Sequence, residues 1–249
     1  MKQYLKVLSV AAGILFLASG VFAQREQLSE SKALGSEESM VADIECGYGE
    51  LRIGAGDDAA AFSVDIQYFE KYPRPLFDYE IQDGVGHLQL RMEDDNDINI
   101  DDGEEKAQWN IMLNPVLPTE LNIALGLGTG IMEFGGLSLT EVNLSNGLSD
   151  TELNVSEPND ETVEVIKIET GLGEFRGKNL ANTRFEHLKF ECGLGKATLD
   201  FHGNGLDQSY VDVSVGLGSA TLIFPKNVGV RVEKDDSFLS KVSLDSDFR

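Results

Sequence analysis

A Gly-Leu-Gly tripeptide recurs at nearly constant spacing through the second half of the chain. The first glycines of five copies are Gly126, Gly147, Gly171, Gly193 and Gly216, so successive copies lie 21, 24, 22 and 23 residues apart. A period in this range is typical of architectures in which one short unit is stacked on the next. The repeat therefore constrains the chain to a fold of stacked units.

Two weaker copies lie upstream, at Gly47-Tyr48-Gly49 and Gly84-Val85-Gly86, with longer spacings of 37 and 42 residues. The longer spacings leave room for inserted loops. One regular copy is imperfect, because Ser149 takes the place of the second glycine. A stack of many units tolerates one imperfect corner.

Apolar residues alternate on both sides of each glycine pair. They occupy the fifth and third positions before the first glycine: Leu121 and Ile123, Val142 and Leu144, Ile166 and Ile168, Leu188 and Phe190, Val211 and Val213. The alternation resumes after the glycines, as in Ala197, Leu199 and Phe201. A period of two indicates a strand. Each unit is predicted to be strand, corner, strand.

The corner itself has an apolar residue between its glycines in every copy. Glycine allows a sharp bend and a close approach of neighbouring backbones. We expect the middle residues to point inward as a stacked ladder, formed by Tyr48, Val85, Leu127, Leu148, Leu172, Leu194 and Leu217.

The repeat predicts an all-β fold, a single-chain β-solenoid (β-helix) of about seven coils with Gly-x-Gly corners. A unit of two short strands cannot bury its apolar face alone, so units must stack at about 4.8 Å per coil. About seven coils would extend roughly 35 Å. A β-sandwich of hairpins is the alternative. The in-register glycines favour the solenoid.

The N-terminus resembles a secretory signal peptide. Lys2 and Lys6 precede an apolar stretch that ends at Val21-Phe22-Ala23, so cleavage is expected after Ala23. An uncleaved membrane anchor is the alternative. The predicted organisation is a signal peptide (1–23), a flexible leader (24–40) and a β-solenoid domain (41–249), with irregular early coils (41–120), regular coils (121–226) and a C-terminal cap (227–249).

The chain is strongly acidic. Loss of Lys2 and Lys6 with the signal peptide lowers the formal net charge from −23 to −25. Such a charge disfavours binding to nucleic acid and to anionic membrane surfaces. It also suits the solubility of an exported protein.

The two cysteines, Cys46 and Cys192, each stand directly before a repeat glycine. They occupy equivalent positions in distant coils, whereas a disulfide requires Cα atoms within about 7 Å. We expect two separate, reduced and partly buried thiols.

No motif in the sequence predicts a cofactor or metal site. Gly126-Leu127-Gly128 leads into another strand and not into the helix that a dinucleotide fingerprint requires. The acidic run from Glu93 to Asp102 partly resembles a calcium loop, with possible ligands Asp97, Asn99 and Asp101, but its glycine is one position late (Gly103) and position twelve is Gln108. A solvated loop is the favoured interpretation.

Catalytic residues are not predicted either. The outward positions of the regular coils are Asn122, Asn143, Ser145, Lys167, Glu169, Lys189, Glu191, Asp212 and Ser214. Among them, Glu169 and Glu191 would stack one coil apart, as the carboxylates of a carbohydrate-active β-helix enzyme could, but no aromatic or arginine accompanies them. The histidines, His87, His187 and His202, share no repeat position and no metal-ligand spacing.

The segment from Trp109 to Asn159, together with "GLGKATLDF" and "GLGSATLIFPKNVGVRVE", resembles the LiaF-like, toast-rack group of bacterial cell-envelope domains and the putative-adhesin β-solenoids related to them. The resemblance covers about residues 40 to 249 and is strongest after Pro118. It implies a non-enzymatic envelope protein, and it supplies no site residues.

These observations predict an exported β-solenoid, periplasmic or at the bacterial cell surface, with a binding, adhesin-like or scaffolding role. Its partner would be an envelope protein or glycan. The alternatives are a carbohydrate-active β-helix enzyme and an accessory sensor in envelope-stress signalling.

Overall fold

A computed structural model describes residues 25–93, 106–234 and 243–245. Within these ranges the chain forms β-strands and one short 3-10 turn, η1 (Leu180–Thr183). The strands are β1 (Arg25–Ala33), β2 (Ser39–Ala55), β3 (Ala60–Phe69), β4 (Pro75–Gln82), β5 (Val85–Met92), β6 (Gln108–Leu113), β7 (Thr119–Glu133), β8 (Leu139–Asn154), β9 (Val163–Lys178), β10 (Phe185–Asp200) and β11 (Tyr210–Ile223).

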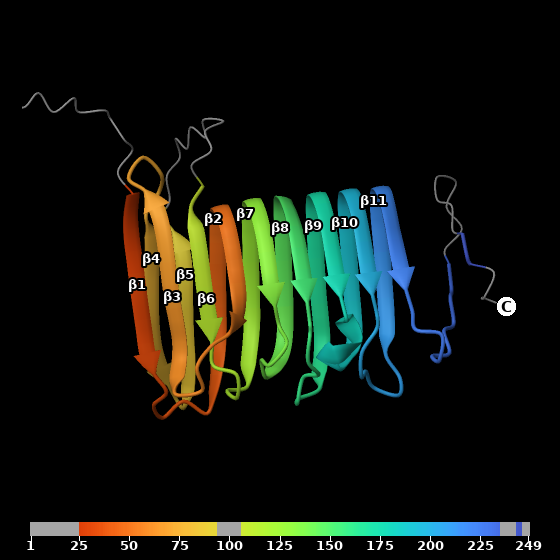
Figure 1. The fold of residues 1–249 in the computed structure, drawn as a ribbon, viewed down its shortest axis with the longest axis horizontal. Coiled ribbons are helices and arrows are strands. Elements are labelled where there is room, and N and C mark those ends of the chain that lie inside the picture. Colours follow the sequence, from red (N-terminus) through yellow and green to blue (C-terminus); the bar gives the residue numbers. More distant parts are fainter. Residues whose placement is uncertain (1–24, 94–105, 235–242, 246–249) are drawn as a thin grey trace, which may run out of the picture.

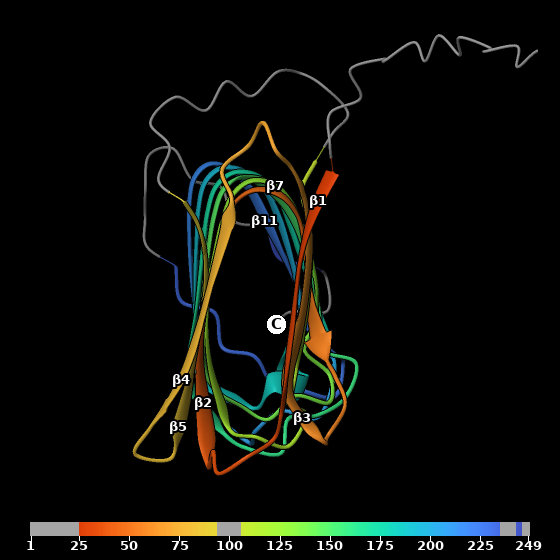
Figure 2. The same ribbon diagram turned by 90° about the vertical axis from the view of Figure 1, so that its left-hand side faces the viewer.

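Each long strand bends at its glycine pair into an arch with two legs. We call the half before the glycines the first leg and the half after them the second leg. β2, β7, β8, β9, β10 and β11 stack in parallel along the molecule (Figure 1), so the first legs form one wall and the second legs form the other (Figure 2). This is the predicted β-solenoid; a sandwich of hairpins would require antiparallel neighbours.

The walls are extended at the N-terminal end by shorter strands. β5 and β4 continue the wall of first legs, while β6, β3 and β1 continue the wall of second legs. The predicted flexible leader, 24–40, is therefore wrong over Arg25–Ala33, which forms β1 and pairs antiparallel with β3. Its mostly polar sequence gave little strand signal, because an edge strand is held chiefly by backbone hydrogen bonds. The predicted signal peptide lies outside the described residues.

The copy at Gly84-Val85-Gly86 is not a coil corner. Asp83 and Gly84, with φ of 51° and 82°, form the tight turn of an antiparallel hairpin between β4 and β5. Two consecutive positive φ values are what such hairpin turns require. In the described residues, the corners that stack in register are those beginning at Gly47, Gly126, Gly147, Gly171, Gly193 and Gly216.

The hydrophobic core fills the space between the walls. The apolar residues predicted to point inward before the glycines are buried from Leu121 through Phe190, and Val211 and Val213 of the last strand are half-buried. Trp109 of β6 and Phe175 of β9 add large buried rings. The period-two pattern thus identified the core correctly.

The predicted inward ladder of middle residues is wrong in the regular coils. Leu148, Leu172, Leu194 and Leu217 are 52%, 49%, 44% and 68% exposed. The chain reverses direction at this residue, so its side chain lies on the convex side of the arch. The inner ladder is formed instead by the residues directly before the first glycines: Cys46, Leu125, Asn146, Thr170, Cys192 and Val215.

The imperfect corner at Ser149 disturbs the ladder only locally. Pairing between β8 and β9 passes from Leu148↔Leu172 to Thr151↔Phe175. Between them, Asp150 Oδ1 accepts a hydrogen bond of 2.9 Å from the backbone N–H of Glu174. A side-chain acceptor thus replaces a carbonyl of the interrupted ladder.

Cys46 and Cys192 are both buried and free, as expected. Four strand-to-strand steps separate them, which is about 19 Å at the usual spacing. Burial raises the pKa of the Cys46 thiol to about 12. Cys46 is therefore a protonated, unreactive core residue at neutral pH.

The predicted C-terminal cap, 227–249, forms no strand in its described parts, 227–234 and 243–245. No helix in the described ranges is both long enough and apolar enough to span a membrane.

Candidate functional site

The outer face of the first legs carries two in-register rows of side chains, all of them polar except Ala124. Because inward positions on these legs are apolar, the alternate residues point outward. One row is Asp43, Asn122, Asn143, Lys167, Lys189 and Asp212, and the other is Glu45, Ala124, Ser145, Glu169, Glu191 and Ser214. All the residues predicted to point outward therefore lie together on one face, which we call the first-leg face.

A ladder of side-chain amides holds the first three residues of the first row in place. Asn122 Nδ2 donates to Asp43 Oδ1 at 2.9 Å, and Asn143 Nδ2 donates to Asn122 Oδ1 at 2.8 Å. Each amide also donates to a glutamate two residues earlier, Glu120 at 3.1 Å and Glu141 at 3.0 Å. The amides and carboxylates are thus fixed relative to one another before any ligand arrives.

Two shallow depressions lie on this face, with volumes of about 560 and 450 Å³. The side chains of Asp43, Glu45, Gln89, Arg91, Asn122, Asn143 and Ser145 contribute to the lining of the first. The second is lined by Ser145, Glu169, Glu191 and Ser214 together with residues of the arches. Both are open, and charged or polar side chains contribute to the lining of each, whereas small-molecule sites are enclosed and mostly apolar. The face therefore suits an extended polar ligand that lies across several coils.

Glu169 and Glu191 do line one depression together, one strand apart. Acid–base catalysis by two carboxylates needs environments that differ, so that one is protonated while the other is ionised. These two glutamates occupy equivalent exposed positions, and no aromatic or basic side chain lines their depression. The geometry therefore does not assign one glutamate as the acid and the other as the base.

The other candidate residues are dispersed. His187 stacks on Tyr210 with ring centroids 5.0 Å apart, His202 Nδ1 lies 2.5 Å from Asp200 Oδ1, and His87 belongs to β5. Among the described residues, no group of three or more His, Cys, Asp or Glu is arranged to hold a metal ion. The calcium-loop residues Asp97, Asn99, Asp101 and Gly103 lie outside the described ranges, and Gln108 begins β6.

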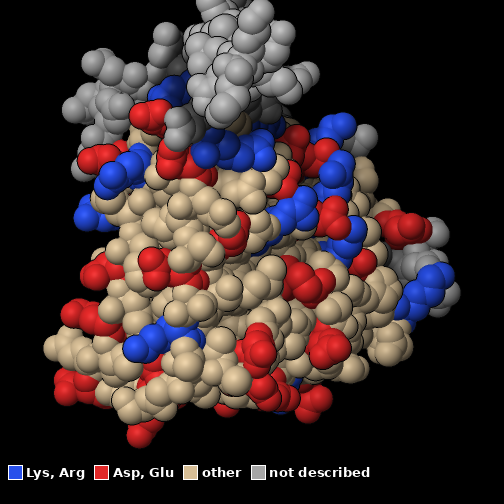
Figure 3. Space-filling model, turned by 60° about the vertical axis from the view of Figure 1, so that its left-hand side comes forward, with Lys and Arg blue, Asp and Glu red and all other residues tan. Residues whose placement is uncertain are grey.

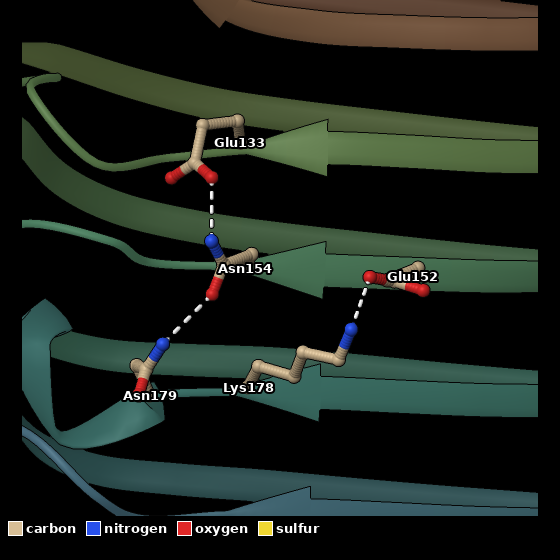
Figure 4. A network of polar contacts seen from close by, with 5 residues as sticks. All are labelled: Glu133, Glu152, Asn154, Lys178 and Asn179. Atoms are coloured by element: carbon tan, nitrogen blue, oxygen red, sulfur yellow. Dashed lines mark hydrogen bonds and ion pairs between the residues drawn. The ribbon is translucent and has the colours of Figure 1, made fainter.

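A second polar network lies at the ends of the second legs (Figure 4). Glu133 Oε2 accepts from Asn154 Nδ2 at 2.6 Å, and Asn154 Oδ1 accepts from Asn179 Nδ2 at 2.9 Å. Burial raises the pKa of Glu133, but hydrogen bonds from the backbone N–H groups of Ser156 and Gly135 and from the Asn154 and Ser156 side chains outweigh it and lower the pKa. This network ties three consecutive coils together.

We expect Glu133→Gln to lower the free energy of unfolding at pH 7 by about 1 kcal/mol, since hydrogen bonds to a carboxylate are lost but solvent partly screens them. A lowered pKa in the fold means that the stabilisation is present above the unfolded value of 4.5 and is lost as pH falls through the folded value. The difference between variant and parent in urea denaturation should therefore shrink toward pH 3.

The control is Glu152→Gln, which removes the exposed pair with Lys178 (2.5 Å) that lies beside this network (Figure 4). Its effect should be small at every pH. An equal loss in the two variants would show that the depressed pKa of Glu133 contributes nothing.

Buried asparagines that the sequence did not single out join the bases of the coils. Asn159 Nδ2 donates to the Leu139 carbonyl and its Oδ1 accepts from the Leu139 N–H, both at 2.8 Å. Asn182 Nδ2 donates to the Val155 carbonyl at 2.8 Å. Asparagine recurs in the loops that follow the second legs, and this recurrence is the feature of the sequence from which these residues could have been predicted.

Charges on the surface are mixed. Figure 3 shows acidic and basic side chains interspersed, with acidic ones along the lower edge of the view and no broad basic area on that side. This arrangement agrees with the net charge of −23.

Comparison with known families identifies the fold. A family described as the N-terminal domain of toast_rack matches residues 21–176, which is more than half of the chain. The chain belongs to the toast-rack family. The family resemblance predicted from the glycine corners is thus confirmed.

Solved structures were compared with the fold as well. A protein of Clostridium sporogenes described as a "putative cell adhesion protein" is 20% identical, with a TM-score of 0.63 over 80% of this chain and 99% of that one. A "putative adhesin" of Bacteroides fragilis is 13% identical over 82% of this chain and 99% of that one, with a TM-score of 0.30. The first likeness shows a shared fold. Comparison with curated proteins gives no match.

Proposed function

We propose that this toast-rack protein is an exported, non-enzymatic binding protein of the bacterial envelope, and that its first-leg face binds an extended polar partner. The observation that carries the proposal is the ladder from Asp43 through Asn122 to Asn143, which fixes carboxylate and amide oxygen acceptors at the spacing of the coils. Binding to pre-arranged groups loses less conformational entropy than binding to mobile ones.

Further support comes from the relatives and from the N-terminus. A protein whose solved structure shares the fold is described as a putative cell adhesion protein. The sequence ending at Ala23 resembles a signal peptide, which agrees with a role outside the cytoplasm. A surface rich in amides and carboxylates can bind the hydroxyl groups of a glycan or the polar backbone of an envelope protein.

The proposal predicts saturable binding without turnover. The mature chain, residues 24–249, would be incubated with peptidoglycan and with acidic and neutral polysaccharides, and both retained ligand and new reducing ends or unsaturated products would be measured. We expect retention of at least one polymer and no product. Product formation that is abolished by Glu169→Gln or Glu191→Gln would assign the enzymatic alternative instead; the absence of any retention would refute the binding role for these ligands.

A further inference from the structure

The middle residues of the arches form an exposed apolar line along the molecule. Leu127, Leu148, Leu172, Leu194 and Leu217 pair in register on successive strands, and we call this line the leucine crest. Four steps at the usual strand spacing give it a length of about 19 Å. Glycine flanks each leucine on both sides except at Ser149, so neighbouring side chains do not cover the line.

The N-terminal end of this line is covered by the chain itself. Tyr48, the equivalent residue of β2, packs against Tyr72 of the β3–β4 loop with ring centroids 5.3 Å apart. Tyr48 and Tyr72 are 7% and 5% exposed, and Leu127 packs against the same cluster. The ammonium of Lys71 lies 5.0 Å from the centroid of the Tyr72 ring. An aromatic side chain accompanied by a cation thus covers the line where it begins.

Beyond Leu127 the described residues leave the crest open. Exposure is 52%, 49%, 44% and 68% for Leu148, Leu172, Leu194 and Leu217. A single exposed leucine is ordinary, but a continuous apolar line bordered by polar residues marks a protein interaction surface. The open part of the crest is continuous with the part that Tyr72 already covers within the chain itself.

The charges beside the crest indicate which kind of partner can bind to it. Exposed carboxylates border it on both sides, Glu169 and Glu191 on the first legs and Asp150 on the second. Lys196, also exposed on the second legs, adds one positive charge, so the border remains acidic on balance. A second copy, or an anionic membrane, would bring like charges together. A segment that carries basic residues would be attracted instead, as Lys71 and Arg74 flank Tyr72 and Pro73 in the chain's own loop.

We propose that the open crest, from Leu148 to Leu217, is a docking surface for an extended segment of another protein, one that carries aromatic side chains flanked by lysine or arginine. The aromatic rings lie against the leucines, and the basic groups lie beside the bordering carboxylates. The proposal rests on the crest and on the carboxylates that border it, and it does not depend on the amide ladder of the first-leg face.

The test uses the loop's own sequence as the probe. A peptide with two copies of residues 68–75 (YFEKYPRP) would be titrated into the mature chain while leucine methyl resonances are followed by NMR. We expect saturable shifts at Leu148, Leu172, Leu194 and Leu217 and none at the buried Leu188. Peptides with every Tyr changed to Ala, or with Lys and Arg changed to Glu, should bind at least about tenfold more weakly.

Matched protein variants complete the test. Leu172→Gln with Leu194→Gln should abolish the shifts at the remaining crest leucines, and unchanged thermal melting would show that the fold is intact. Shifts that survive in this variant, or no shifts at millimolar peptide, would overturn the proposal. Concentration-dependent dimerisation or binding to phosphatidylglycerol vesicles that is lost in the variant would instead assign the crest to a second copy or to a membrane.

Discussion

Gly195→Ala is expected to lower the free energy of unfolding by about 3–5 kcal/mol, a large effect for a single added methyl group. A Cβ at this position would lie 2.0 Å from the carbonyl oxygen of Gly173 on the neighbouring strand. Its φ of 151° is also rarely adopted by residues with a side chain. Neither backbone can move without breaking the stack, so the clash cannot be relieved. Urea denaturation followed by circular dichroism measures the loss.

Gly229→Ala is the matched control. A Cβ there would meet no atom within 4 Å, so its effect should lie within about 0.5 kcal/mol of zero. If Gly195→Ala unfolded at the same urea concentration as the parent, close stacking at the arches would be incorrect.

Phe190→Ala should have a comparable effect, about 3–5 kcal/mol, because it opens a cavity between the walls. Phe190 is fully buried in β10, and its ring centroid lies 5.4 Å from that of Phe175. Leu194→Ala, four residues along the same strand, should cost less than about 1 kcal/mol, since Leu194 is 44% exposed. Similar losses for the two variants would indicate that Leu194 is buried, and they would contradict the existence of an exposed leucine crest.

The direction of the crest leucines could not be predicted from alternation. Inward residues before the arch of β7 are Leu121, Ile123 and Leu125, whereas those after it are Gly130 and Met132. The inward residues are odd-numbered before the arch and even-numbered after it, so the alternation must shift by one residue somewhere within the arch. Leu127 continues the odd-numbered series, and alternation alone therefore predicts that it points inward. Hydrophobicity favoured the interior, but the bend placed the side chain on the convex side.

Other parts of the fold also differ in whether the sequence pattern could predict them. Regular spacing and alternation were sufficient to predict the stacking, the core and the outward residues of the first legs. They could not predict β1, because pairing through backbone groups leaves little pattern in side chains. The link from Asp43 to Asn122 required the register between strands 79 residues apart, which one sequence does not contain. The same register brings the site residues onto one face.

The central claim, that the first-leg face is the binding surface, is tested most directly by one pair of arginine substitutions. Asn143→Arg places a bulky side chain in the amide ladder, and Thr129→Arg places the same group on the opposite wall, between Glu50 and Asp150. Both sites are half-buried. Affinity for sedimented envelope material should fall at least about tenfold in Asn143→Arg and stay within about twofold in Thr129→Arg. Equal affinities for the two variants, or a loss confined to Thr129→Arg, would contradict the account.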